Sequence, residues 1–398
     1  MEAKFPSLEY DSQVVFVSRN LPPLLGGMEN LGANLCRVLA KEFRTSIIGP
    51  NGCQKYFGGA VVGECGFANL STFLPCSMVK TLFEVPRKRS AIVFGGSGLM
   101  APTVLLASRY AAGASICYLH GLDIVTPNSI YQSVFLPCIR RLDLLLVNSE
   151  NTARLAHTNG VADGKVRVLH PCIENRKPNS GIDINSLQEK YSLKNRTILL
   201  SVGRLTARKG LQEFILNSLP LVKKSIDNVL LAVVGGEANQ AVNRSSGQTE
   251  LLRSAAEQSG MSDAVRFYGS VDDDTLEEFY RVADLFVFPG ISKSGDVEGF
   301  GIVAVEAAAR GLPSVAFEVG GIPDAVHNGV SGYLIPPGNY ERFASAIVRH
   351  MLEGRSNSMK SGCMEFAQKF SPDIFATKLI EYCNEVRESR ALGNTIGE

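Results

Sequence analysis

Short apolar runs alternate with longer segments of helical periodicity along most of the chain. In the first half, this pattern predicts strands at residues 13–17, 45–48, 91–94, 115–119 and 144–147, and helices at residues 29–42, 99–110, 130–141 and 152–158. Most positions of these strand runs are apolar, which is typical of strands that are covered on both faces. Repeated strands and helices with tight turns indicate a parallel, doubly wound sheet. The first half is therefore predicted to be a Rossmann-like α/β domain.

The same alternation starts again after a polar stretch, HPCIENRKPNSGIDINS, at residues 170–186. Because this composition is typical of a linker, we predict two domains, at residues 1–175 and 176–372. The second half has predicted strands at residues 197–202, 229–234, 265–268, 285–288 and 314–317, and helices at residues 248–259, 274–283, 301–309, 323–328 and 340–353. A closing helical segment is predicted at residues 372–390.

The composition agrees with two soluble domains. A chain of 398 residues is too long for one ordinary core, and 45% hydrophobic with 20% charged residues is typical of a globular protein. The formal net charge of +1 gives no reason to expect a nucleic-acid partner. Nine scattered cysteines without a C-x-x-C pair are interpreted as reduced, buried side chains. The first residues, MEAKFPSLEYDSQ, lack the apolar core of a signal peptide, so we expect a cytoplasmic protein.

One uncharged stretch, residues 90–108, is long enough to cross a bilayer. Gly95, Gly96 and Gly98 interrupt it, and Pro102 suits the first turn of a helix. A buried strand, a glycine turn and a helix therefore explain this stretch better than a membrane span.

The densest candidate chemistry lies at residues 296–311, DVEGFGIVAVEAAARG, where two glutamates flank a glycine-broken entrance to a helix. The residues of this entrance are Gly299, Phe300, Gly301, Ile302 and Val303. Backbone N–H groups at a helix start favour an anion such as a phosphate. Helix rise puts Glu298 and Glu306 roughly 10 Å or more apart, so one carboxylate could accept hydrogen bonds from a sugar and the other from a ribose. This length fits a nucleotide sugar, and an ordinary buried helix with surface glutamates is the alternative.

Cations follow the first predicted strand of the second half, in the segment SVGRLTARKG at residues 201–210. Arg204 and Lys209, with Gly203 beside them, offer a planar fork of donors and a compact point charge. Together they could neutralise a leaving diphosphate without a metal. The alternative is a pair of solvated surface side chains.

Two features of the first half follow predicted strands, and doubly wound sheets bind ligands beyond the carboxyl ends of their strands. Gly26 and Gly27 precede a helix and would let the backbone approach a ligand closely, although such glycines also serve turns alone. His120 directly follows the strand at residues 115–119, in the sequence HGLD. A histidine that makes only structural hydrogen bonds is the alternative there.

Motifs of several other site classes are absent. The chain has no Walker motif G-x-x-x-x-G-K-S/T, and no G-x-G-x-x-G opens either half, so triphosphate hydrolysis and nicotinamide binding lack support. It has no H-E-x-x-H motif and no Cys/His cluster that would indicate zinc. We therefore expect neither a metal nor another cofactor.

Taken together, the motifs resemble those of the retaining glycosyltransferases of family 4, which have the GT-B fold. The resemblance rests on Gly26-Gly27 with Glu29, HGLD, SVGRLTARKG, VRFYGSV, ADLFVFPG, EGFGIVAVEAAARGLPSVAFEVGGIPDAV and GYLIPPGN, which follow the family's order over most of residues 13–353. It implies two doubly wound Rossmann-like domains that face each other across a cleft. The N-terminal domain would bind the acceptor and the C-terminal domain the nucleotide sugar. It also implies that the closing helix, about residues 373–398, packs back on the N-terminal domain.

The resemblance implies a role for each candidate residue by its position in these motifs. Glu298 would hold hydroxyls of the donor sugar, Glu306 those of the ribose, and His120 the transferred sugar near its reacting carbon. The two cations would bind the diphosphate, Gly27 the phosphates, and the loop around Val271 the base. The implied catalytic residues are His120, Glu298, Arg204 and Lys209, and the implied substrate-binding residues are Gly26, Gly27, Gly203, Val271, Gly299, Phe300, Gly301, Ile302, Val303 and Glu306.

The sequence DVEG is similar to that of mannosyl- and deoxymannosyltransferases that use GDP sugars. A GDP sugar is therefore favoured over a UDP sugar as the donor, with a glycan or lipid-linked acceptor in polysaccharide or glycolipid biosynthesis. The chain departs from the family at Asp324, where many relatives carry glutamate, and in the insertion-like segment ISKSGDV. Neither departure removes a proposed catalytic group.

A basic cluster adjoins the apolar segment FLPCSMVKTLF and consists of Lys80, Arg87, Lys88 and Arg89. Such a cluster could lie on an anionic membrane that carries a lipid-linked acceptor, which would make the protein peripheral on the inner face of the membrane. A solvated loop is the alternative.

Three functions remain open at this point. The first is a retaining hexosyltransferase, the second a GT-B sugar-nucleotide epimerase, and the third a noncatalytic nucleotide-sugar-binding subunit. Product analysis separates the first two. The third would be favoured if His120 or Glu298 were missing, and both are present. The transferase is the preferred interpretation.

Overall fold

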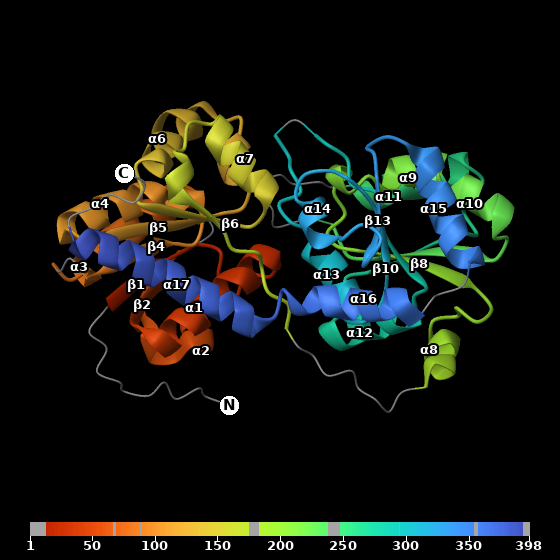
Figure 1. The fold of residues 1–398 in the computed structure, drawn as a ribbon, viewed down its shortest axis with the longest axis horizontal. Coiled ribbons are helices and arrows are strands. Elements are labelled where there is room, and N and C mark those ends of the chain that lie inside the picture. Colours follow the sequence, from red (N-terminus) through yellow and green to blue (C-terminus); the bar gives the residue numbers. More distant parts are fainter. Residues whose placement is uncertain are drawn as a thin grey trace. The chain divides into compact units, whose positions relative to one another are not determined.

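The computed structural model describes residues 13–66, 69–87, 90–174, 183–237, 247–293, 295–353 and 357–392. Contacts divide the chain into two compact units, one formed by Met1–Cys172 with Pro372–Glu398 and the other by Ile173–Ser371. The division after Cys172 falls inside the polar stretch that was predicted to be the linker. Each unit is a parallel sheet with helices packed against it (Figure 1).

The first unit contains a seven-stranded parallel sheet. Its strands are β1 (Gln13–Val17), β2 (Arg44–Pro50), β3 (Val61–Cys65), β4 (Ile92–Gly95), β5 (Ala114–Leu119), β6 (Leu144–Val147) and β7 (Val166–Val168). They lie in the order β3-β2-β1-β4-β5-β6-β7. The order reverses between β1 and β4, so the loops after these two strands lie at the switch point where doubly wound sheets bind ligands.

Helices cover both faces of this sheet. They are α1 (Gly27–Glu42), α2 (Gln54–Phe57), α3 (Leu70–Glu84), α4 (Ala101–Ala111), α5 (Leu122–Val125), α6 (Leu136–Arg140), α7 (Glu150–Thr158) and α17 (Pro372–Ala391). In α1, Leu31, Leu35 and Leu39 recur at every fourth position and are buried, as expected for an amphipathic helix on a sheet. Phe375 and Leu379 of α17 belong to the same core cluster, so the C-terminal helix packs on the face that α1 covers (Figure 1).

The second unit contains a six-stranded parallel sheet. Its strands are β8 (Thr197–Val202), β9 (Val229–Val234), β10 (Val265–Gly269), β11 (Leu285–Phe288), β12 (Ser314–Phe317) and β13 (Gly332–Ile335), in the order β10-β9-β8-β11-β12-β13. The helices are α8 (Ile184–Lys190), α9 (Leu211–Asn217), α10 (Leu219–Ser225), α11 (Gln248–Gln258), α12 (Asp273–Val282), α13 (Ile302–Ala309), α14 (Ile322–Ala325), α15 (Tyr340–Leu352) and α16 (Asn357–Gln368). Here the order reverses between β8 and β11, which are paired neighbours. The loops after β8 and β11 therefore emerge side by side at the carboxyl edge.

The prediction of parallel, doubly wound sheets is confirmed in both units. Residues 92–111 form β4, a short 3-10 turn at Gly98–Met100 and α4, as predicted for the uncharged stretch. Within the described ranges, no helix is long and apolar enough to cross a membrane.

Among the elements of the first unit that were not predicted are β3 and α3. The residues of β3 are only partly buried at the sheet edge, and α3 carries Pro75 in its interior, so neither has an ordinary hydrophobic pattern. Cys65 in β3 and Cys76 in α3 form a disulfide with a Cα–Cα distance of 6.1 Å. This disulfide corrects the prediction that all cysteines are reduced. The pair was missed because a sequence separation of 11 residues matches no recognisable cysteine motif.

Candidate active site

The loop after β8 packs directly against the loop after β11. It passes through a 3-10 turn at Ala207–Lys209 and ends at Gly210, which has a φ of 66°. A Cβ on Gly210 would lie 1.9 Å from the carbonyl oxygen of Pro289, so only glycine permits this approach. The backbone N–H of Ile291 donates to the carbonyl oxygen of Arg208 at 2.9 Å. Two loops that are distant in sequence are thus fixed to each other.

This arrangement surrounds the Glu298 carboxylate with cations. Lys209 Nζ lies 3.0 Å and Arg208 Nε 3.2 Å from the same oxygen, Glu298 Oε2. Arg208 Nη1 also lies 3.6 Å from Asp296 and donates to Thr206 Oγ1 at 3.1 Å. The Lys209 and Glu298 side chains are both only 12% exposed. Glu298, Lys209 and Arg208 form what we call the ion-pair cluster.

Burial and charge act in opposite directions within the ion-pair cluster. Burial alone would raise the pKa of Glu298, but Lys209 and Arg208 outweigh it and hold the pKa below its usual value. Burial lowers the pKa of Lys209 despite the attraction of Glu298, and the charges of Arg208 and Arg204 lower it further. Lys209 Nζ also lies 4.5 Å from the centre of the Phe288 ring. Two cations, Lys209 and Arg208, thus share one buried carboxylate oxygen, and both could donate to an incoming phosphate.

Arg208 was not among the predicted site residues. Arg204, which was predicted, is exposed in the same loop and influences Lys209 electrostatically. Arg208 and Lys209 are adjacent in the sequence ARKG, and the sequence does not show which of the two side chains points toward Glu298. The doublet itself is the only signal that could have drawn attention to Arg208.

The entrance of α13 depends on close backbone packing. Gly301 is the N-cap of α13 with a φ of 93°, and a Cβ there would lie 2.8 Å from Phe288. A Cβ on Gly321 would lie 2.1 Å from the carbonyl oxygen of Gly299. Glycines thus permit the close packing at this entrance. Ile302 and Val303 form the first turn of α13, where backbone N–H groups have no partner within the helix.

Three other predicted residues have mainly structural surroundings. Phe300 is buried, and its ring centre lies 5.4 Å from that of Phe370. Val271 packs, partly buried, against the core of the second unit. Gly203 lies so close to the next loop that a Cβ on Gly235 would come within 1.9 Å of the Gly203 carbonyl oxygen. Any contact of these residues with a ligand stays a prediction.

Glu306 is held separately from the ion-pair cluster. Its Oε2 atom accepts a hydrogen bond from the Tyr280 hydroxyl at 3.0 Å. Tyr280 lies on α12 and was not predicted as a site residue. The 26-residue separation gives no local motif, and only the packing of α12 and α13 brings the two side chains together.

In the first unit, the two predicted glycines lie at the start of α1. Gly26 is the N-cap, and a Cβ there would lie 2.5 Å from Glu29 Oε2. Glu29 is buried and accepts a hydrogen bond from Asn20 Nδ2 at 2.9 Å. The Cβ position of Gly27 has no atom within 4 Å, so the backbone at this residue has open space beside it. Such space suits the predicted approach of a ligand.

His120 follows β5 and is anchored at two points. Its ring Nε2 lies 3.0 Å from the carbonyl oxygen of Gly96, and its backbone N–H donates to Asp123 Oδ2 at 2.9 Å. Because a carbonyl oxygen only accepts, Nε2 carries the hydrogen, and Nδ1 of the neutral ring keeps a lone pair. The side chain is thus oriented at the carboxyl end of β5 with Nδ1 as an acceptor.

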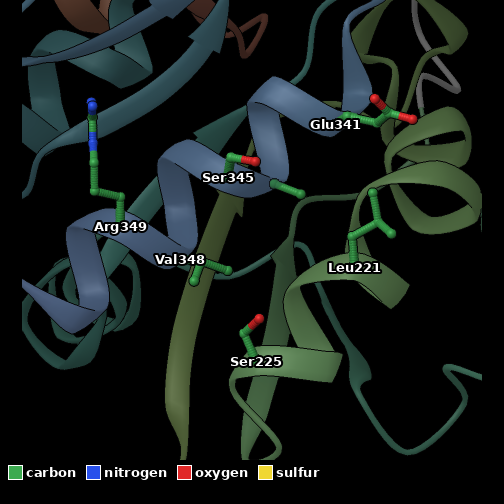
Figure 2. A pocket seen from close by; sticks show the side chains of 7 residues that line it. Leu221, Ser225, Glu341, Ser345, Val348 and Arg349 are labelled. Atoms are coloured by element: carbon green, nitrogen blue, oxygen red, sulfur yellow. The ribbon is translucent and has the colours of Figure 1, made fainter.

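The pocket drawn in Figure 2 lies elsewhere in the second unit. It has a volume of about 360 Å³, lies beside α10 and α15, and is lined by Leu221, Ser225, Glu341, Ala344, Ser345, Val348 and Arg349. No predicted site residue lines it. In the part of the chain that the structure describes, no group of three or more His, Cys, Asp or Glu is arranged to hold a metal. The expectation that no cofactor is needed stays a prediction.

Comparison with known proteins connects this geometry to a family. The family described as "Glycosyl transferases group 1" matches residues 183–367, which cover most of the second unit. A GDP-mannose-dependent alpha-(1-6)-phosphatidylinositol monomannoside mannosyltransferase of Mycolicibacterium smegmatis is 30% identical over 350 residues, covering 84% of this chain and 88% of that protein. The chain belongs to the group 1 glycosyltransferases. The enzyme of the same name from Mycobacterium tuberculosis is 29% identical to this glycosyltransferase, covering 93% of this chain and 98% of that one.

Solved structures agree with the fold of this glycosyltransferase. Anabaena HepE in complex with UDP and glucose has a TM-score of 0.75 at 19% identity, covering 94% of this chain and 100% of HepE. Sucrose-phosphate synthase from Thermosynechococcus elongatus has a TM-score of 0.73 at 18% identity, covering 95% of this chain and 100% of that chain. These similarities confirm the predicted GT-B fold class, and the family confirms the predicted glycosyltransferase activity.

Proposed function

We propose that this glycosyltransferase transfers a hexose, with mannose favoured, from a GDP sugar to a lipid-linked or glycan acceptor, with retention of the anomeric configuration. The observation that carries this proposal is the ion-pair cluster beside the entrance of α13. The DVEG sequence supports the choice of donor, and so do two similar enzymes that are named as GDP-mannose-dependent. The resemblance to retaining transferases supports the stereochemistry.

The diphosphate would replace Glu298 as the partner of Lys209 and Arg208. Lys209 and Arg208 contact Glu298 in the free protein, and a diphosphate brings more negative charge than one carboxylate does. The backbone N–H groups at the start of α13 add further donors. As the bond from the sugar to the phosphate breaks, charge develops on the leaving phosphate, and these preoriented donors stabilise it.

The transferred sugar would be held by carboxylate and imidazole acceptors. We assign Glu298 Oε1 and Oε2 to ring hydroxyls of the sugar and His120 Nδ1 to a hydroxyl near the reacting carbon. Because Glu298 is assigned to ring hydroxyls and not to the reacting carbon, it is not placed to act as a covalent nucleophile. We therefore expect the acceptor to react without a glycosyl-enzyme intermediate.

A panel of nucleotide sugars tests the proposed function. GDP-mannose, GDP, UDP-glucose and UDP are added to the purified protein in thermal-shift measurements, because a ligand at about 100 times its Kd stabilises a fold by about 2.7 kcal/mol. Of the two nucleotide sugars, the one that stabilises the protein more strongly is then incubated with acceptor lipids. A sugar bonded to an acceptor supports the transferase, a new free nucleotide sugar would indicate an epimerase, and binding without any product would indicate a noncatalytic subunit.

We further propose that one end of the α3/α4 helix pair contacts an anionic membrane. Phe83 near the end of α3 is 88% exposed, and Tyr110 near the end of α4 is 48% exposed. Arg87 joins the two ends, since its Nη2 donates to the Tyr110 hydroxyl at 2.7 Å and its guanidinium lies 4.4 Å from the ring centre. Arg109 is exposed beside them. Lys88 and Arg89 of the predicted basic cluster lie outside the described residues.

Vesicle flotation tests this contact. We expect the protein to float with vesicles that contain anionic phosphatidylglycerol, and less with neutral vesicles or at high salt. Replacing Phe83 with serine should reduce the floated fraction several-fold because an apolar side chain that is 88% exposed is lost. Replacing Leu352, which is 72% exposed on α15, with serine is the matched control. Binding that ignores both salt and anionic lipid would rule out the contact.

A further inference from the structure

A tyrosine from the neighbouring helix fixes the carboxylate of Glu306. The Tyr280 hydroxyl lies 3.0 Å from Glu306 Oε2 and 3.3 Å from the carbonyl oxygen of Val303. A phenol has one hydrogen to donate, and a charged carboxylate is the stronger of these two acceptors. The Tyr280 ring is only 3% exposed, so core packing prevents the hydroxyl from moving away.

Arg310 stabilises the same turn of α13 through a hydrogen bond to its backbone. Its Nη1 donates to the carbonyl oxygen of Glu306 at 3.0 Å. Its Nε and Nη2 lie 2.8 Å and 2.5 Å from Glu277 Oε2 on α12. The guanidinium also lies 5.3 Å from the centre of the Tyr280 ring. The backbone of Glu306 and one oxygen of its carboxylate are therefore both tied to α12.

We propose that Tyr280 is a positioning residue for nucleotide recognition, which holds Glu306 ready to accept hydrogen bonds from both ribose hydroxyls. This inference rests on the proposed function, in which Glu306 binds the ribose. A carboxylate offers about four lone-pair sites, so its two oxygens can accept from two neighbouring hydroxyls while one of them also accepts from Tyr280. A glutamate that is already fixed loses less rotamer freedom on binding than a free one.

In this role, the effect of Tyr280 on nucleotide binding differs from that of an ordinary core residue. Its contribution passes through Glu306, so it depends on the ribose hydroxyls being present in the ligand. The phenol is a donor at every working pH, because burial and then the charge of Glu306 raise the pKa of Tyr280 well above its usual value. A core tyrosine without this role would affect all nucleotides equally.

Calorimetric titration with two nucleotides tests the role of Tyr280. GDP and 2′,3′-dideoxy-GDP are titrated into the unmodified protein, Tyr280→Phe, Glu306→Gln and the double variant, or the uridine pair is used if UDP binds more tightly. We expect Tyr280→Phe to weaken GDP binding about five- to tenfold and dideoxy-GDP binding less than about twofold. The double variant should bind GDP within about twofold of Glu306→Gln, because Tyr280 acts through that carboxylate. In transfer assays, the donor KM should rise while kcat changes little.

A matched control is Tyr333→Phe, which removes another phenol oxygen from the same unit, 3.3 Å from His350 Nδ1. Its nucleotide affinities should not change. Glu306→Asp tests the positioning role with Tyr280 intact. The shorter carboxylate should lose the hydrogen bond from the Tyr280 hydroxyl, so this variant should bind GDP more weakly.

The unfavourable outcomes distinguish the positioning role of Tyr280 from the ribose contact of Glu306. Equal weakening of GDP and dideoxy-GDP by Tyr280→Phe would overturn the positioning role, and so would unchanged GDP binding by Tyr280→Phe or Glu306→Asp. If Glu306→Gln itself does not discriminate between the two nucleotides, the ribose contact in the proposed function is wrong.

Discussion

Replacing Glu298 with glutamine is expected to lower kcat about 100- to 1000-fold, the size of effect seen when one preorganised contact to a transition state is removed. The variant keeps the shape of the side chain but loses the charge that is expected to hold the sugar hydroxyls. Binding of GDP should not weaken, because Lys209 and Arg208 lose their carboxylate partner and stay available for phosphate. Steady-state kinetics and calorimetry measure the two quantities.

Two further variants are compared with Glu298→Gln. Lys209→Ala removes one charge-assisted contact and should weaken GDP binding by about 1.5–3 kcal/mol. Glu318→Gln changes an exposed glutamate of the same unit and should change neither quantity. A Glu298→Gln variant that loses GDP affinity as strongly as Lys209→Ala, with kcat unchanged, would contradict the assignment of Glu298 to the sugar.

Replacing His120 with alanine is expected to lower kcat about 100-fold while GDP affinity stays within about twofold, because the ring is assigned to the sugar and not to the nucleotide. The two anchors at Gly96 and Asp123 orient Nδ1 as an acceptor. His120→Asn puts an amide oxygen near the position of Nδ1, and His120→Gln puts its amide near Nε2. Kinetics should therefore show more activity for the asparagine variant than for the other two.

The control for His120 is His157→Ala on α7, whose ring contacts the carbonyl oxygen of Val161 at 3.3 Å. This variant should keep its kcat. If all three His120 variants keep the activity of the unmodified protein, His120 makes only structural hydrogen bonds, which is the alternative that the sequence left open.

The fold was predictable wherever burial leaves a simple pattern. Strands such as β5 and β9 are buried along their whole length, so their apolar runs stand out from the polar turns around them. β3 is an edge strand with partly exposed residues, and α3 contains Pro75, so both lack that pattern. The disulfide between them depends on their packing, which no sequence spacing encodes.

The candidate site was predictable where backbone geometry requires particular residues. Gly301 and Gly210 stand where a side chain would collide with Phe288 or with the Pro289 carbonyl, and such requirements leave motifs in the sequence. Arg208 and Tyr280 leave no such motif. They reach Glu298 and Glu306 only because β8 pairs with β11 and α12 packs near α13.

The stereochemistry of the product tests the central proposal most directly. The nucleotide sugar that stabilises the protein most is reacted with its acceptor, and the anomeric configuration of the new linkage is determined by NMR from its one-bond carbon–proton coupling. We predict the same anomeric configuration as in the donor, with no sugar attached to Glu298 in mass spectra of the protein. An inverted anomeric centre, or a sugar trapped on Glu298, would contradict the mechanism.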